Sequence, residues 1–345
     1  MSRAQLTSTV EQSNGGVVAP FLAGKNKIIN GDFGIWQRGA SFSNPSSLAY
    51  TADRWAIYYD GSGATRTISQ QAFTTGAAPV SGYESSFFYR YAVSVAGSGN
   101  TANLLRQYIE NVRNFAGQTA TVSFWAKASA NITVPSVGTT QNFGTGGSPS
   151  AGVDTGFATN IAVTTSWQRF SFTANIPSIS GKTLGTNNDT SLELRFFLPA
   201  GSSTFTFDIW GVQVEAGSVA TPFTTASGTL QGELALCQRY FWQISSANID
   251  RVAAQAISST RAFGPLPLPV TMRTAPSYSF AAASNFGLIN SSGGVLTCTT
   301  VSIAAQATNM VTLDFTSSGG GLTAGNATAC WFQSTSSTIA LSAEL

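Results

Sequence analysis

Side chains that can carry out acid–base chemistry are few and scattered in this chain. The sequence contains no histidine, which excludes Ser-His-Asp and Cys-His mechanisms in their usual form, and also zinc bound by imidazole. Glycoside hydrolysis needs two carboxyl groups that flank one bond, and no spacing singles out such a pair among Glu110, Glu193, Asp208 and Glu215. Glu193 points outward beside Arg195, like an ordinary surface pair. We therefore expect that the protein is not an enzyme.

A second constellation is Asp53-Arg54-Trp55, which has an indole beside two residues of opposite charge. Such a group can bind a sugar, because a pyranose ring stacks on an indole while the hydroxyls of the sugar need fixed hydrogen-bond donors and acceptors. However, Trp55 continues one face of a segment with Ile57 and Tyr59, as a core tryptophan does. We favour a core role for Trp55 and expect the Asp-Arg pair to hold the start of a strand.

Three further tryptophans, Trp125, Trp167 and Trp210, stand in segments that resemble strands. Trp125 and Trp210 are out of phase with their apolar neighbours Phe124 and Ile209. Because successive side chains of a strand point to opposite faces, one residue of each neighbouring pair faces outward or into a second layer.

The densest aromatic segment lies at residues 83–91. Phe87, Tyr89 and Tyr91 share one face, and Phe88 and Arg90 share the other. A row of exposed aromatic residues is typical of glycan-binding surfaces and of subunit interfaces, and a core role is the alternative.

The elements that must position these residues are β-strands. The segments "TADRWAIYYD", "TATVSFWAKA" and "SLELRFFLPA" alternate apolar and polar residues with a period of two, and Gly, Asn and Pro separate such segments. In "STFTFDIWGVQVEAG", the alternation of apolar residues runs through Phe207 and Ile209, and it resumes with a change of phase at Val212 and Val214. Many such strands without long helical patterns predict an all-β fold.

The segment "KIINGDFGIWQRGASF" (27–42) contains strong turn chemistry in Asn30-Gly31. We expect it to form the first turn and strand of a β-sandwich, with Phe33 and Ile35 packed inward.

Shifts in composition divide the chain into four parts. We expect an N-terminal arm at 1–26, a β-sandwich at 27–224, a linker with a short helix at 225–243 and a smaller C-terminal β-sandwich at 244–345. The helix is predicted from Leu230, Leu234 and Cys237, which recur at helical spacing.

Charge and cysteine content exclude several classes of protein. Charged residues make up 9% of the chain and the net charge is +2, without a basic run, so nucleic acid is not an expected partner. No apolar segment reaches the roughly 20 residues that a membrane-spanning helix needs. Cys237, Cys298 and Cys330 are odd in number and far apart, which favours three buried thiols and synthesis in a reducing compartment.

Several segments resemble bacteriophage tail-fibre and other virion-surface proteins, from about residue 25 to the end of the sequence. These are "KIINGDFGIWQRG", "YTADRW", "TVSFWAKA", "SWQRFSFT", "DIWGVQVEAGSVATPF", "ELALCQRYFW", "VTMRTAPSYSF" and "STIALSAEL". The resemblance implies a virion component assembled in the host cytoplasm, a homotrimer, and an N-terminal arm that docks on other tail proteins.

Residues 27–223 also resemble, more distantly, the jelly-roll carbohydrate-binding modules of bacterial polysaccharidases. In those modules the opening region and the closing strand bind a structural calcium, which would correspond to Asp32 and Asp208 here, although Gly34 replaces a glutamate of the family. The resemblance also implies a glycan-binding face, to which we assign Trp125, Trp210, Phe88 and Arg90.

Three functions follow from this reading. The first is a non-enzymatic tail fibre or appendage that binds host surface polysaccharide for adsorption. The second is a capsid decoration or tail assembly protein that binds only other virion proteins, and the third is a glycan depolymerase.

Overall fold

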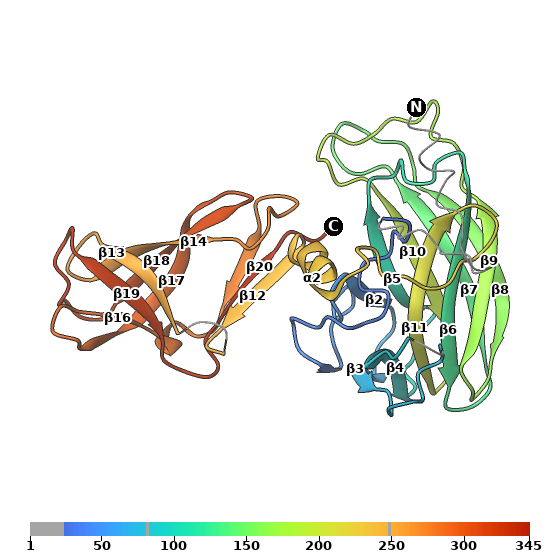
Figure 1. Ribbon diagram of the computed structural model, residues 1–345, viewed down its shortest axis with the longest axis horizontal. Helices are drawn as coiled ribbons and strands as arrows, with labels where there is room; N and C mark the ends of the chain where they lie inside the picture. Colours follow the sequence, from blue (N-terminus) through green and yellow to red (C-terminus); the bar gives the residue numbers. More distant parts are fainter. Residues whose placement is uncertain (1–23, 81–82, 248–249) are drawn as a thin grey trace, which may run out of the picture.

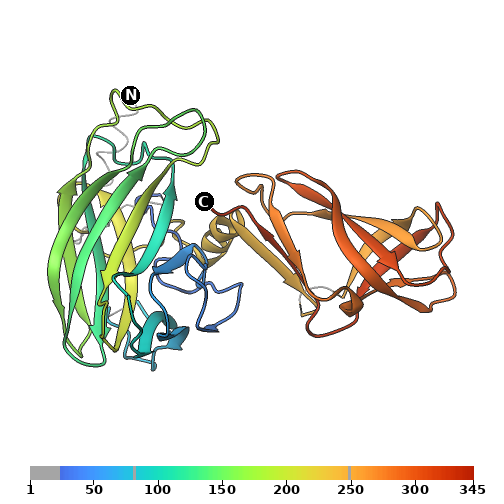
Figure 2. The same ribbon diagram turned by 180° about the vertical axis from the view of Figure 1, so that it is seen from behind.

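The alternating segments form antiparallel strands, and these build two β bodies with a short helix between them (Figures 1 and 2). The computed structural model describes residues 24–80, 83–247 and 250–345. Residues 1–23 of the predicted arm lie outside this part of the chain. Among the described residues, no helix has the length and apolar character to cross a membrane.

The N-terminal body is a sandwich of two sheets, which confirms the all-β fold class. The six-stranded sheet has the order β1 (Ser41–Ser43), β3 (Thr65–Ala72), β4 (Phe87–Val95), β11 (Phe205–Ala216), β6 (Thr119–Ala128) and β9 (Gln168–Asn175). The five-stranded sheet has the order β2 (Trp55–Tyr59), β5 (Asn103–Glu110), β10 (Ser191–Leu198), β7 (Ile132–Asn142) and β8 (Val153–Val163).

Aromatic residues from both sheets fill the space between the layers. Phe196 of β10 meets Phe124 of β6 edge-on, with 5.0 Å between ring centroids. Trp55 of β2 is fully buried beside Phe196, so the core role predicted for this tryptophan is confirmed. Burial of apolar side chains on this scale is the main stabilising contribution to such a fold.

A β-bulge explains the change of phase in β11. The register with β6 shifts between Trp210 and Gln213, and Gly211 within this interval has φ +66°. An extra residue in one strand exchanges the two faces, so Ile209 before the bulge and Val212 after it both point into the core. Glycine suits this position because its backbone is left-handed.

The opening segment 27–42 differs from the expectation. Its turn is present, with Asn30 at φ +57°, and Phe33 and Ile35 are buried. However, regular strand begins only at Ser41. The Asn30 side chain takes the place of a strand partner, because its amide donates to the carbonyl oxygens of Ile35 and Asp53 at 2.8 and 3.0 Å.

Helix α2 (Leu230–Gln238) lies between the two bodies (Figure 1). Thr229 caps it by accepting a 3.0 Å hydrogen bond from the Gly232 amide. The helix forms where the spacing of Leu230, Leu234 and Cys237 predicted it, but Leu230 and Leu234 are exposed. Glu233 is buried instead, since its carboxylate accepts hydrogen bonds from the amides of Asn30 and Ser227 at 2.7 and 2.8 Å.

The C-terminal region is a closed barrel with an attached sheet, which corrects the predicted second sandwich. The barrel order is β13 (Arg251–Ala256), β14 (Arg261–Pro267), β18 (Met310–Ser317), β17 (Val295–Gln306), β16 (Phe286–Ile289) and β19 (Ala327–Phe332), and η1 (Ala283–Asn285) precedes β16. A three-stranded sheet consists of β12 (Phe241–Ser245), β20 (Thr338–Ser342) and β15 (Ser277–Phe280). Two register shifts in β17 let the sheet curl until β13 pairs with both β14 and β19.

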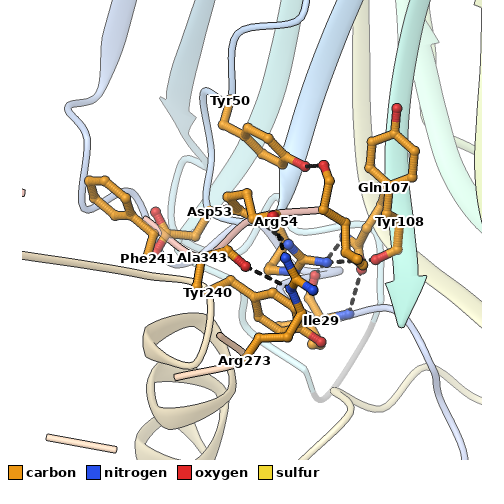
Figure 3. A network of polar contacts seen from close by, with 12 residues as sticks. Ile29, Tyr50, Asp53, Arg54, Gln107, Tyr108, Tyr240, Phe241, Arg273 and Ala343 are labelled. Carbon is orange, nitrogen blue, oxygen red and sulfur yellow. Dashed lines mark hydrogen bonds and ion pairs between the residues drawn. The ribbon is translucent and has the colours of Figure 1, made fainter. Parts of the chain in front are cut away.

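A buried polar network joins the two bodies (Figure 3). Arg54 forms an ion pair with Glu344, donates to the Tyr108 carbonyl at 2.6 Å and lies 3.5 Å from the centroid of the Tyr240 ring. Arg38 also pairs with Glu344, at 3.0 Å. The residues after β20 are therefore fastened to the sandwich. The expected Asp53–Arg54 pair is wrong, because Arg54 pairs with Glu344 and Asp53 lies 3.7 Å from Arg38 instead.

Candidate functional site

The predicted glycan-binding residues gather on the outer face of the six-stranded sheet, but their rings are covered. Trp125, Trp210 and Phe88 are 9%, 0% and 6% exposed and form a small apolar cluster with Phe223. The Trp210 indole donates a 2.7 Å hydrogen bond to the Ser85 hydroxyl. A sugar needs an open ring face, so the assignment of these three residues to glycan stacking is corrected: they form a second layer.

Chain segments far from the indoles provide this cover. Phe73 and Tyr83 lie 6.2 and 5.6 Å from Trp210, between ring centroids, and Phe223 lies 5.0 Å from it. These residues follow β3, precede β4 and follow β11. Trp167 is only half-buried and lies 5.3 Å from Phe88.

Arg90 and Asp208 are cross-strand neighbours on the same outer face. The Arg90 guanidinium donates to both carboxylate oxygens of Asp208, at 2.7 and 2.8 Å, and the Lys127 ammonium lies 3.8 Å away. Two cationic side chains thus engage the Asp208 carboxylate, and Arg90 is committed to a bidentate pair with it. Asp208 therefore does not fit the predicted role of calcium ligand, and Arg90 does not fit the predicted role in glycan binding.

The other predicted calcium ligand, Asp32, lies beside Tyr83 and Glu84. Burial raises the pKa of Asp32, although a hydrogen bond from the Gly34 amide opposes the shift. Across residues 24–80, 83–247 and 250–345, no three His, Cys, Asp or Glu side chains come together to hold a metal. With Asp208 engaged by Arg90, the residues present do not fit the implied calcium site.

The outer face of the five-stranded sheet carries a different set of side chains. Strand register places them in three rows that cross the sheet. The first row is Tyr108, Glu193, Thr140 and Asp154, the second is Ala56, Arg106, Arg195, Gly138 and Gly156, and the third is Tyr58, Leu104, Phe197 and Ser136. We call these three rows the five-stranded face.

Charges on the five-stranded face are paired. Arg106 donates to Glu193 at 3.1 Å, and Arg195 donates to Asp154 at 2.7 Å. The Thr140 hydroxyl also donates to Asp154, at 2.7 Å. Two positive and two negative charges leave the face without a net charge, while their orientations are held by these bonds.

Aromatic rings stand beside the arginines. The Arg106 guanidinium lies 5.1 Å from the Tyr108 ring centroid and 5.7 Å from that of Tyr58, and Arg195 lies 5.2 Å from Phe197. Burial raises the pKa of the Tyr108 hydroxyl, and Glu193 adds to the shift. Tyr108 is therefore neutral at pH 7 and can both donate and accept a hydrogen bond.

Such a face can bind a polyhydroxylated chain. Rings that are half-exposed offer apolar surface to a pyranose, and the Asp154 carboxylate, which is 70% exposed, offers a hydrogen-bond acceptor to its hydroxyls. Sequence reasoning missed these residues and treated Glu193 and Arg195 as an ordinary surface pair. The available signal was the placement of Tyr58, Tyr108 and Phe197 in the outward phase of their strands.

No protein-family model and no curated protein matches the chain. Among solved structures it is similar to one entitled "CBM4 structure and function", at 18% identity, over 55% of this chain and 98% of that chain, with a TM-score of 0.33. A family 11 carbohydrate-binding module from Clostridium thermocellum, in complex with a β-1,3-1,4-mixed-linked tetrasaccharide, is 12% identical over 53% and 98% of the two chains, with a TM-score of 0.29.

Another similar structure is the enzymatically active domain of bacteriophage CBA120 tailspike protein 4. It is 16% identical over 52% of this chain and 21% of that chain, with a TM-score of 0.31. Each of these three structures covers about half of this chain, between 52% and 55%.

Proposed function

We propose that the protein binds a neutral glycan chain across the five-stranded face of its sandwich. The observation that carries this proposal is the row arrangement of Tyr58, Tyr108 and Phe197 around two charge-balanced arginine–carboxylate pairs. The absence of net charge on this face favours a neutral chain over an acidic one, because an anion would have to compete with Glu193 and Asp154 for the guanidinium groups.

We further propose that the protein belongs to a bacteriophage virion, as a tail fibre or related appendage that adsorbs to host polysaccharide without cleaving it. The resemblance of several sequence segments to virion-surface proteins supports this role. A homotrimer would present three faces, and linked sites raise overall affinity by about 10²–10⁴ when they engage together. Weak individual sugar sites are then sufficient for adsorption.

Retention on immobilised host polysaccharide tests the binding site. Tyr108→Ala and Phe197→Ala each remove a ring from the five-stranded face, and we expect each to lower affinity roughly tenfold, the effect of one lost aromatic contact of about 1.4 kcal/mol. Tyr278→Ala is the matched control, because Tyr278 is 46% exposed on β15 in the other body. Equal retention of all three variants would contradict the proposed site.

Immunogold labelling of intact particles tests the virion role separately. Label at the distal end of the tail supports adsorption. Label on the capsid, together with failure to bind any host polysaccharide, would favour a decoration protein instead. A loss of polysaccharide viscosity on incubation with the purified protein would show cleavage and overturn the non-enzymatic proposal.

A further inference from the structure

A hollow of about 510 Å³ lies where α2, β12 and the barrel meet the sandwich. Its walls include Gln37 from the sandwich, Leu234 and Gln238 from α2, Trp242 and Gln243 from β12, and Leu266 from β14. The volume is within the range of about 300–1,000 Å³ that is usual for small-molecule sites. None of its lining residues is ionisable, and three of them carry side-chain amides.

The amides are available for a ligand. Gln37 uses its side-chain amide to donate to Asp53 and, at 2.8 Å, to the Phe241 carbonyl, which holds the side chain in place and leaves its own oxygen as an acceptor. The side chains of Gln238 and Gln243 make no hydrogen bond to any described residue and are half-buried. A ligand that covers these half-buried amides must replace water as the partner of both their donors and their acceptors.

The wall formed by β12 adds backbone groups. β12 is an edge strand that pairs only with β20. The Phe241 carbonyl points away from β20, because it accepts a hydrogen bond from Gln37. Peptide groups two residues apart in a strand share a direction, so the N–H and C=O of Gln243 also face the open edge.

We propose that this hollow is a second saccharide site, which binds one or two units of a neutral sugar. Amides provide the adjacent donor and acceptor that vicinal hydroxyls require, and Trp242 provides a half-exposed indole beside them. A charged ligand would find no counter-ion there, and a wholly apolar ligand would leave the glutamine amides desolvated without partners. The site does not depend on binding at the five-stranded face.

Ligand-observed saturation-transfer NMR on the full chain, with lactose, maltose and cellobiose as probes, tests this proposal. We expect transfer to at least one disaccharide in the wild-type protein and in the Tyr108→Ala variant. Gln238→Ala should weaken binding about tenfold, and it leaves the helix intact because alanine is the best helix former. Gln243→Ala should have a similar effect, while Gln306→Ala, on an exposed part of β17, should have none.

Absence of transfer to all three sugars would overturn the second site. So would equal transfer in Gln238→Ala, Gln243→Ala and wild type. Transfer that disappears in Tyr108→Ala and persists in the glutamine variants would assign the sugar to the five-stranded face alone. Failure of the wild-type protein to be retained on host polysaccharide, with disaccharide transfer still observed, would contradict only the function proposed for that face.

Discussion

The Glu344→Gln substitution tests the joint between the two β bodies. The Glu344 carboxylate is 7% exposed and pairs with both Arg54 and Arg38, and the side chain of Arg54 is 1% exposed. An amide preserves the shape of the side chain but removes the negative charge. The substitution therefore leaves one guanidinium buried without its counter-ion.

The contacts that remain set the size of the effect. Removing one partner of a buried ion pair costs about 3–5 kcal/mol. Arg54 retains the Tyr108 carbonyl and the Tyr240 ring, and Arg38 retains Asp53 at 3.7 Å. Burial lowers the pKa of Arg38 to about 10, so Arg38 stays charged at neutral pH. We expect a cost near the lower limit, about 3 kcal/mol, or about a hundredfold in the opening equilibrium of the joint.

Hydrogen exchange of the Ala343 amide reports this opening, because that amide donates to the Tyr240 carbonyl at 2.7 Å beside the joint. Its protection should fall about a hundredfold in Glu344→Gln at pH 7. Asp154→Asn is the matched control, since it removes the same charge from a pair whose carboxylate is 70% exposed, and such pairs contribute about 0–1 kcal/mol. A similar fall in Ala343 protection in the two variants would refute the argument from burial.

Three further substitutions test the packing of the sandwich. Trp210→Ala should lower the free energy of unfolding by about 3–5 kcal/mol in urea titrations, because it empties the covered cluster, and a change below about 1 kcal/mol would mean that the cluster is not a second core. Gly211→Ala should lower the melting temperature more than Gly217→Ala in calorimetry, because both have positive φ but only at Gly211 would the new Cβ lie 2.9 Å from an indole carbon. Burial alone would raise the pKa of Glu215, but Lys25 and several hydrogen bonds hold this pKa below the ordinary value. The contribution of Glu215 to stability is therefore present above the unfolded pKa of about 4.3 and is lost as pH falls below that value. Between pH 6 and 2.5 the wild type should therefore lose more stability than Glu215→Gln, and parallel pH profiles would contradict this.

Local patterns were enough to locate most strands. The segment 119–128 alternates along its length and forms β6 over the same residues. The change of phase between Ile209 and Val212 was visible in the sequence, and the bulge at Gly211 is its cause. Such features depend on neighbouring residues, because side-chain direction in a strand alternates with every position.

Cover and curvature depend on residues that are distant in the sequence. The sequence places Trp210 on an outward face, but in the structure Tyr83 and Phe223 cover its indole. The C-terminal strands read as a sandwich, but their closure into a barrel depends on the pairing of β13 with β19, which are about 75 residues apart. Alternation with a period of two predicts which residues share a face of a strand. It does not predict what packs against that face.

The candidate site shows the same division. By itself, the sequence determined that the chain is all-β, that histidine chemistry is absent and that aromatic residues alternate in its strands, because composition and period are properties of the chain alone. Only the tertiary structure decided that Tyr108, Glu193 and Thr140 lie in one row, and that Trp125 and Trp210 are covered. The physical reason is that strand register and layer packing are set by contacts between segments about 50–100 residues apart, which no local pattern specifies.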